Sequence, residues 1–385
     1  MMDKIYLDYA ATAPMLPEVL EEMMPYFVSS YGNPSGIHAT GREARKAIET
    51  ARRRTARAIG AENTEICFTS GGSESDNLAI QGAAFAFKDK GNHLITSAVE
   101  HPAVIQSCRW LEKQGFRVTY LPVDQFGMVS PETLEETVCP ETILVSIMTA
   151  NNEIGTLEPV AEIGRICREK GILFHTDAVQ AVGAIELRVQ DLNADLLSIS
   201  AHKFHGPKGV GALYIRQGTR LESVIHGGKQ ERGLRAGTEN VPGIVGLGRA
   251  IEIAEENRLN CIQSIREKRD ILIREVLEKI PGSQLNGHPE QRLPNHCHFS
   301  FAGIESEALL LRLDLAGIAA SGGSACTSGS LEKSHVLEAI GLEEDMIRGS
   351  IRMTLGQETT REEILQAAQS LRTIVEDLRG LTGWH

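Results

Sequence analysis

Seven short runs of apolar and β-branched residues recur between about residues 60 and 220, separated by longer stretches that suit helices. The runs are EICFTS (65–70), HLITSAV (93–99), RVTYLPV (117–123), TILVSIMT (142–149), ILFHTDA (172–178), DLLSISA (195–201) and VGALYIR (210–216). Helix-compatible stretches between them, such as 75–91, 103–115 and 158–171, end in glycine, which is favoured just past the end of a helix. The alternation predicts an α/β fold with a mostly parallel seven-stranded sheet covered by helices on both faces.

The pattern changes from about residue 250. A long charged helix is predicted over about 247–279, followed by strands that include 297–301 and 350–355 and by a final helix over about 361–379. A chain of 385 residues is also long for one hydrophobic core. We therefore expect a large domain at 15–255 and a smaller α+β domain formed by 1–14 and 256–385.

Charge and hydropathy narrow the classes of partner. The chain has 51 acidic and 39 basic residues, a formal net charge of −12, and no block rich in Lys and Arg. Direct binding to nucleic acid is therefore not expected. The first 20 residues do not resemble a secretion signal, and no apolar window is long enough to span a membrane. These features predict a cytoplasmic protein.

The seven cysteines are widely spaced and include no C-x-x-C pair. This pattern argues against a disulfide framework and against a zinc or iron–sulfur site within the chain. His296-Cys297-His298 could place two imidazoles on one face of a strand, but no third ligand lies nearby in sequence. We expect reduced thiols and no metal site.

The ends of the predicted strands carry the candidate chemistry, because ligands of open α/β sheets bind beyond the carboxyl ends of the strands. Gly71-Gly72-Ser73 follows the first strand and opens a helix, an arrangement that suits an anion at the helix N-terminus. The alternative is a plain glycine-rich turn with a serine cap. His101 and Asn152 also follow strands, where residues of these types are usually loop hydrogen-bonders.

Asp177 and Lys203 follow consecutive strands and lie one strand–helix–strand crossover apart, so they should project into the same crevice. They could form a simple ion pair. They also supply two of the groups that pyridoxal 5'-phosphate (PLP) requires, which are a lysine for its aldehyde and a carboxylate for its ring nitrogen; the 71–75 turn would take its phosphate. His101 above the ring and Gln180 at the ring hydroxyl would complete such a pocket.

The motifs around these residues resemble those of the cysteine desulfurases of the NifS/IscS type, within the class V aminotransferase family of fold type I PLP enzymes. The motifs occur in the same order over nearly the whole chain, and they are YLDYAATAP, YGNPSGIH, FTSGGSESDN, VEHPAV, NNEIGT, HTDAVQAVG, SAHKFHGPKGVG, ERGLRAGTEN and SGGSACTSGS.

The resemblance implies a role for each matching residue. Lys203 is the lysine that binds PLP covalently, Asp177 the partner of the ring nitrogen, Gln180 the ligand of the phenolic oxygen, and His101 the stacking group and possible proton carrier. The implied phosphate ligands are Gly72, Ser73, Ser200 and His202, with Thr238 from the other subunit of a homodimer. Asn152 would contact the cofactor or the substrate, and Asn33 and Arg352 the substrate carboxylate, which a planar guanidinium can hold by both oxygens.

Cys326 lies in SGGSACTSGS, a segment of small residues with little to bury and a backbone that glycine leaves free to move. A nucleophilic thiol must be a thiolate and accessible, so Cys326 suits this role better than the other six cysteines. We expect it to take sulfur from L-cysteine as a persulfide, leaving L-alanine. The sulfur would then pass to an acceptor protein, such as an iron–sulfur scaffold or a tRNA-thiolation enzyme.

Three alternatives remain open from the sequence. A selenocysteine lyase or another β-eliminating lyase of the same fold would not need the loop cysteine. A catalytically silent sulfur-relay or scaffold protein would bind no PLP and show no yellow chromophore. Lys208 is the rival of Lys203 for the cofactor, although its Gly-Pro-Lys-Gly setting indicates a surface turn.

Overall fold

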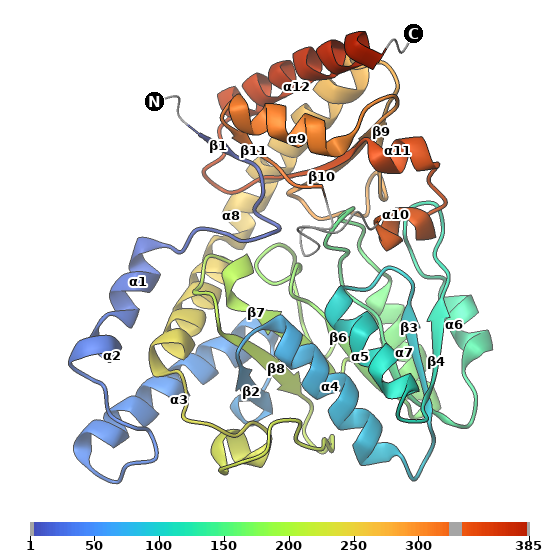
Figure 1. Cartoon of the computed structure of the whole chain (residues 1–385). Helices are drawn as coiled ribbons and strands as arrows, with labels where there is room; N and C mark the ends of the chain where they lie inside the picture. Colours follow the sequence, from blue (N-terminus) through green and yellow to red (C-terminus); the bar gives the residue numbers. More distant parts are fainter. Residues whose placement is uncertain (1–3, 323–332, 383–385) are drawn as a thin grey trace.

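A seven-stranded sheet lies at the centre of the larger part of the molecule (Figure 1). The computed structural model describes residues 4–322 and 333–382. The strand order is β2-β8-β7-β6-β5-β3-β4, in which β8 is antiparallel to both neighbours and the other pairs are parallel. The seven strands are β2 (Ile66–Thr69), β3 (His93–Ser97), β4 (Arg117–Leu121), β5 (Thr142–Ser146), β6 (Leu173–Asp177), β7 (Leu196–Ser200) and β8 (Gly211–Ile215). The predicted fold class and all seven predicted strands are confirmed.

Helices cover both faces of this sheet. One face packs against α4 (Gly72–Phe87) and α5 (Pro102–Glu112). The other face packs against α3 (Ala39–Ile59), α7 (Val160–Lys170) and the first part of α8 (Val241–Lys279). Neighbouring residues of one strand divide between these cores, so that Leu196 joins the first and Leu197 the second. Burial on both sides explains why these strands are apolar throughout rather than alternating.

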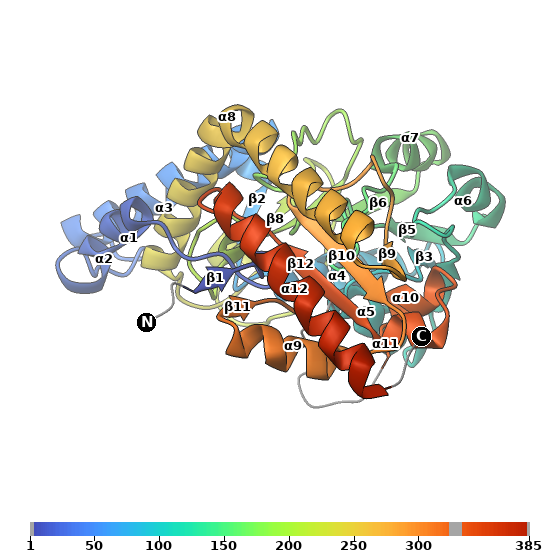
Figure 2. The ribbon, with the colours of Figure 1, turned by 90° about the horizontal axis from the view of Figure 1, so that it is seen from above.

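A smaller unit is built mainly from the C-terminal third of the chain and lies above the large sheet in Figure 1. Its three-stranded antiparallel sheet has the order β12-β10-β9, formed by β9 (Ser283–Leu285), β10 (His296–Phe301) and β12 (Ser350–Thr354). Figure 2 shows α12 (Arg361–Thr382) lying across this sheet beside the second part of α8. A separate parallel pair joins β1 (Ile5–Tyr6) to β11 (Ile318–Ala319), which brings the N-terminal segment to this unit.

The remaining elements are short, apart from α9. They are α1 (Pro17–Met23), α2 (Pro25–Val28), α6 (Pro131–Thr137), α9 (Ser306–Leu315), α10 (His335–Ala339) and α11 (Glu344–Arg348), with 3₁₀ turns at Asn63–Glu65, Ala201–Lys203 and Gln230–Gly233. Among the described residues, no helix combines the length and apolarity needed to cross a membrane.

The hydrophobic cores follow this division into two parts. Ile244 and Ile251 near the start of α8 belong to the core under the large sheet, whereas Leu272 and Val276 belong to the core of the smaller unit. Ile5 of the N-terminal strand joins that second core. The predicted domain boundary at 255/256 would fall inside α8, between these two groups of side chains, and it stays a prediction.

Candidate active site

A cavity of about 800 Å³ opens at the carboxyl ends of the parallel strands, where it meets the smaller unit. Ten of the residues predicted from sequence line it, and they are Gly72, Ser73, His101, Asn152, Asp177, Gln180, Ser200, His202, Lys203 and Arg352. The size suits a cofactor together with a small substrate. Topology brings nine of them together, because strands of one direction end at one edge of the large sheet, and Arg352 is added from β12 of the smaller unit.

Three predicted site residues are placed differently. Asn33 and Thr238 are exposed and do not line the cavity of their own chain. Asn33 instead accepts a hydrogen bond from the backbone N–H of Ser35 at 2.9 Å. Cys326 lies outside the described residues. The functional roles of all three stay predictions.

Lys203 ends the 3₁₀ turn that follows β7 directly. Its Nζ donates hydrogen bonds to the backbone oxygens of Ala10 at 2.5 Å and Ala11 at 3.0 Å. The side chain therefore extends from the large sheet to the N-terminal segment, and both alanines line the cavity with it. Gln180 contacts the same segment, since its Nε2 donates to the oxygen of Ala10 at 3.0 Å.

Asp177 is the last residue of β6, which pairs in parallel with its neighbour β7, as the sequence predicted. The predicted helix between the two strands is wrong, because residues 178–195 connect them through turns. Its Oδ1 accepts the N–H of Val179 at 2.9 Å, which fixes the carboxyl group at the strand end. Burial raises the pKa of Asp177, and the nearby His101 and Lys203 act in the opposite direction. A positive ring N–H beside this buried carboxyl would replace the lost hydration of its ionised form.

His101 caps the N-terminus of α5, where its Nδ1 accepts the N–H of Ala103 at 3.1 Å. Burial lowers the pKa of this imidazole, while the charge of Asp177 opposes the shift. A neutral ring that accepts at Nδ1 carries its proton on Nε2. The hydrogen bond from Ala103 and the lowered pKa both favour the neutral imidazole with its proton on Nε2.

The opposite end of the cavity suits an anion. Gly72 and Ser73 begin α4, a 16-residue helix whose first N–H groups have no partner within the helix. A Cβ on Gly72 would lie 2.7 Å from the side chain of Val179, so the close approach requires glycine. His202 reaches the same end, and burial lowers its pKa to about 4. Its Nδ1 lies 3.2 Å from the hydroxyl of Thr12.

A second cavity of about 420 Å³ adjoins this end and shares Ala11, Gly72, Ser73, Ser200 and His202 with the first. Lys208 lines the second cavity and is not part of the lining of the first. The structure thus places Lys203, rather than its sequence rival Lys208, in the space that also holds Asp177.

Arg352 lies on β12 and is 2% exposed. Its Nη1 donates to the backbone oxygen of Asn152 at 2.8 Å, and its Nη2 pairs with Oδ1 of Asp8 at 3.0 Å. Burial raises the pKa of Asp8, and the guanidinium of Arg352 acts against that rise. A carboxylate is therefore already bound to the group that the sequence assigned to the substrate carboxylate.

Sequence reasoning missed two acidic residues of this site. Asp8 lies within YLDYAATAP, but its ion pair with Arg352 spans nearly the whole chain. Asp76 is 1% exposed and lines the cavity. One of its carboxylate oxygens lies within 4.8 Å of a ring nitrogen of His101 and of a carboxylate oxygen of Asp177. Burial and the charge of Asp177 raise the pKa of Asp76 well above its usual value. Asp76 follows Ser73 by three residues in the same helix, and this spacing could have indicated that both side chains lie on the helix face that lines the cavity.

The donor set fits PLP. A lysine, a buried carboxyl group and a helix N-terminus line one cavity, and these are the groups needed for the aldehyde, the ring nitrogen and the phosphate. His296 and His298 share a face of β10, but within residues 4–322 and 333–382 no third His, Cys, Asp or Glu joins them as a metal ligand.

Comparison with known proteins identifies the family. Residues 5–366 match the family model described as aminotransferase class-V, and the chain belongs to this family of PLP-dependent enzymes. Within the family it groups with the cysteine desulfurases of the IscS/NifS type. This membership confirms the resemblance read from the motifs.

Two curated relatives and two solved structures illustrate the similarity. Cysteine desulfurase IscS of Dictyoglomus turgidum is 55% identical, with 99% of this chain and 97% of that protein covered. IscS of Methanosarcina thermophila is 54% identical, with 98% and 93% covered. A NifS-like protein of known structure is 40% identical, with 97% of this chain and 100% of that chain covered and a TM-score of 0.92. SspA, solved in complex with cysteine, is 38% identical, with 92% and 100% covered and a TM-score of 0.82.

Proposed function

We propose that this protein removes sulfur from L-cysteine, yields L-alanine and carries the sulfur as a persulfide on Cys326. The observation that carries the proposal is the single cavity that joins Lys203, Asp177 and the start of α4 in a chain of cysteine desulfurase ancestry. The cysteine bound to the related SspA supports the choice of substrate.

The residues divide the work along the cavity. Asp177 and Gln180 would hold the ring of PLP, and Lys203 would hold its aldehyde carbon. The phosphate would be held by Gly72, Ser73, Ser200 and His202. When bound, PLP supplies an electron sink for negative charge at the substrate α-carbon. Lys203 would take the α-proton of the substrate and return it before alanine leaves, and His101, which lines the same cavity, would serve as a second proton carrier.

The sulfur transfer requires a thiolate. The thiolate of Cys326 forms a sulfur–sulfur bond with the substrate sulfur as the carbon–sulfur bond breaks, the bonding pair stays on carbon, and protonation of that carbon gives alanine. Burial raises the pKa of the thiols of Cys67, Cys108, Cys167 and Cys297 to about 12, which disfavours the thiolate there. None of the six described cysteines lines the cavity.

A product assay tests the proposal directly. Purified protein loaded with PLP and incubated with L-cysteine should give alanine and transferred sulfur in equal amounts, counted as persulfide plus sulfide. Mass spectrometry of a peptide digest should find the added sulfur on Cys326. Formation of pyruvate and ammonia in place of alanine would exclude a desulfurase.

Arg352 and Asn33 are proposed to bind the substrate carboxylate, with Asn152 beside them. Arg352→Lys should lower kcat/KM for L-cysteine roughly 10- to 100-fold, chiefly through KM, because an ammonium cannot hold both carboxylate oxygens. Steady-state kinetics measure the effect. Arg348→Lys, an exposed arginine paired with Glu344, is the matched control and should leave the kinetics unchanged. An unchanged KM in Arg352→Lys would remove Arg352 from the substrate site.

A homodimer is proposed, in which Thr238 serves the phosphate site of the other subunit. Apolar side chains are exposed on α1, α2 and the segment after them, including Phe27, Val28, Tyr31 and Ile37, of which Ile37 is 91% exposed. Burial of such a group between two copies would explain its exposure on one chain.

Light scattering on a size-exclusion column should give twice the mass of one chain. Tyr31→Asp together with Ile37→Asp should shift that mass toward a single chain. Leu315→Asp, on the equally exposed face of α9, is the control and should leave the dimer intact. A wild-type monomer with full activity would contradict the proposal.

The proposed recipient of the sulfur is an acceptor protein, either an iron–sulfur scaffold or a tRNA-thiolation enzyme, and the proposed compartment is the cytoplasm. The scattered cysteines predict reduced thiols, which suit both sulfur transfer to an acceptor protein and a cytoplasmic location. Transfer of labelled sulfur from the persulfide to each purified acceptor tests the first point, and cell fractionation tests the second.

A further inference from the structure

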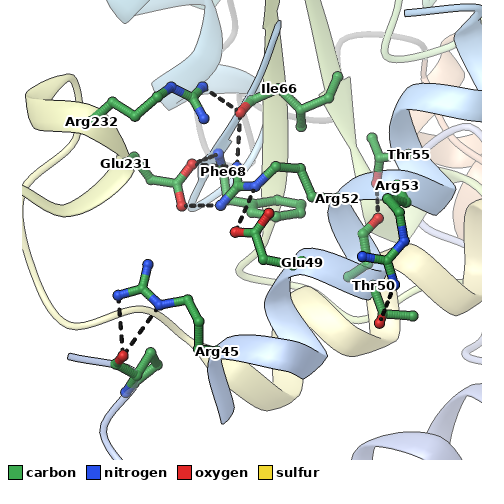
Figure 3. Close-up of polar contacts among 12 residues, drawn as sticks. Arg45, Glu49, Thr50, Arg52, Arg53, Thr55, Ile66, Phe68, Glu231 and Arg232 are labelled. Carbon is green, nitrogen blue, oxygen red and sulfur yellow. Dashed lines mark hydrogen bonds and ion pairs between the residues drawn. The ribbon is translucent and has the colours of Figure 1, made fainter. Parts of the chain in front are cut away.

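A buried ion pair links helix α3 to the loop that precedes α8. Both guanidinium Nη atoms of Arg52 lie 2.8 Å from the carboxylate oxygens of Glu231, and the two side chains are 5% and 3% exposed (Figure 3). The guanidinium of Arg52 also lies over the ring of Phe68, 4.8 Å from its centroid. A bidentate pair of this kind has a defined geometry as well as strong hydrogen bonds.

This ion pair satisfies the open edge of β2. Among the described strands, β2 pairs with β8 alone, so the backbone groups on its other side need partners from elsewhere. The N–H of Phe68 donates to Glu231 at 2.9 Å, and the oxygen of Ile66 accepts from Arg52 at 2.8 Å and from Arg232 at 2.7 Å. Figure 3 shows these side chains meeting at the strand edge. Side chains of two remote segments thus take the place of a further strand.

A second ion pair lies on the other side of the proposed phosphate turn. Nε of Arg235 lies 2.9 Å from Oε1 of Glu74, and Oε2 of Glu74 accepts the N–H of Ser70 at 2.9 Å. The turn at residues 70–73 is therefore held just before its start, at Phe68, and just after its end, at Glu74. Both attachments come from one short segment, residues 231–235.

The backbone of that segment is not in a relaxed conformation. Glu231 and Arg232 have φ values of 42° and 59°, in the left-handed region that side chains other than glycine rarely adopt. Such residues persist where surrounding bonds hold them, and they gather at functional sites. Gly71 of the turn itself has φ 153° and ψ −176°, a conformation open almost only to glycine.

We propose that these two ion pairs, Arg52–Glu231 and Arg235–Glu74, form a clasp that positions the turn at 70–73 to bind the phosphate of PLP. The inference rests on the proposed assignment of Gly72 and Ser73 to the phosphate. Its members are positioning residues, since they act through the turn and do not themselves line the main cavity. Removing one partner of the buried pair Arg52–Glu231 leaves the other charge buried without a counter-ion. The edge of β2 then loses hydrogen bonds, and we expect the turn that follows it to move.

The clasp is tested by measuring how tightly the full chain, stripped of cofactor, binds PLP and pyridoxal. Pyridoxal lacks the phosphate. Arg52→Gln and Glu231→Gln should each raise the Kd for PLP roughly tenfold or more, while the Kd for pyridoxal changes by less than about twofold. Absorbance of the bound chromophore gives both constants, at a temperature where circular dichroism shows each variant folded. Arg54→Gln on the same helix, whose ion pair with Glu22 is partly exposed, is the matched control and should change neither constant.

The outcomes separate the clasp from the assignment beneath it. Ser73→Ala should show the same selective loss of PLP, and if it does not, the proposed phosphate site is wrong. Ser73→Ala can behave as expected while the clasp variants raise the Kd for PLP and the Kd for pyridoxal equally, or change neither Kd. In both cases the clasp has only a structural role and the inference fails. Should Arg52→Gln not fold, Arg235→Gln removes the more exposed pair and must show the selective loss of PLP for the inference to stand.

Discussion

Lys203→Ala is expected to lower the rate of alanine formation from L-cysteine by roughly three orders of magnitude or more. On the proposed assignment, the variant loses both the covalent attachment of PLP and the base that moves the α-proton. After treatment with borohydride, which fixes a lysine–PLP bond, the wild-type protein should retain PLP through gel filtration in denaturant, and the variant should not. Absorbance and mass spectrometry of the treated protein measure this retention.

Lys208→Ala is the matched control, because Lys208 lines neighbouring cavities but not the one that holds Lys203 and Asp177. It should keep its trapped cofactor and its rate of alanine formation. Trapped PLP in the Lys203→Ala protein would refute the assignment of Lys203. Absence of any PLP chromophore from the wild-type protein would instead point to a silent sulfur-relay or scaffold protein.

Cys326→Ala should lower alanine formation from L-cysteine by roughly two to three orders of magnitude while leaving the binding of PLP and of the substrate unchanged. On the proposed mechanism, the variant lacks the thiolate that accepts the substrate sulfur, and none of the six described cysteines lines the cavity to replace it, whereas Lys203 and His101 would still move protons. The colour change that accompanies mixing with L-cysteine should therefore persist while alanine fails to form. Stopped-flow absorbance combined with amino-acid analysis separates the two steps.

Cys139→Ala and Cys261→Ala are the controls, since these are the two described cysteines that are not fully buried. Both should retain the persulfide and the rate of alanine formation. Full activity of Cys326→Ala with L-cysteine would contradict the persulfide mechanism. It would favour a selenocysteine lyase or another β-eliminating lyase.

The sequence predicted the large sheet and the meeting of Asp177 and Lys203 because both depend on local patterns. Buried parallel strands give continuous apolar runs, and one crossover of known handedness brings the ends of neighbouring strands together. The same reasoning located Gly72 and Ser73 at a helix start. Each of these inferences needs only the order and direction of neighbouring strands, which is why the meeting of Asp177 and Lys203 was predicted although turns replace the helix expected between β6 and β7.

The missed features depend on contacts between distant segments. Asp8 and Arg352 meet across a separation of 344 residues, and Arg52 and Glu231 across 179. No periodicity encodes which charged side chain will reach such a partner. The short strands β1 and β11 were missed for the same reason, since two residues each give no pattern. The resemblance alone supplied Thr238 and Asn33, and neither lines the cavity of its own chain.

The ion pair between Asp8 and Arg352 has a consequence for substrate entry. On the proposed assignment, a substrate carboxylate that reaches Arg352 must share or take over a guanidinium that already holds a carboxylate. Binding is then an exchange of one anion for another, and the charge beside the guanidinium changes little. A thiol amine without a carboxylate group, such as cysteamine, has nothing to exchange. On that assignment the Asp8 carboxylate is a resident competitor, and the gain from binding an amino acid is the difference between two guanidinium–carboxylate pairs rather than the full strength of one.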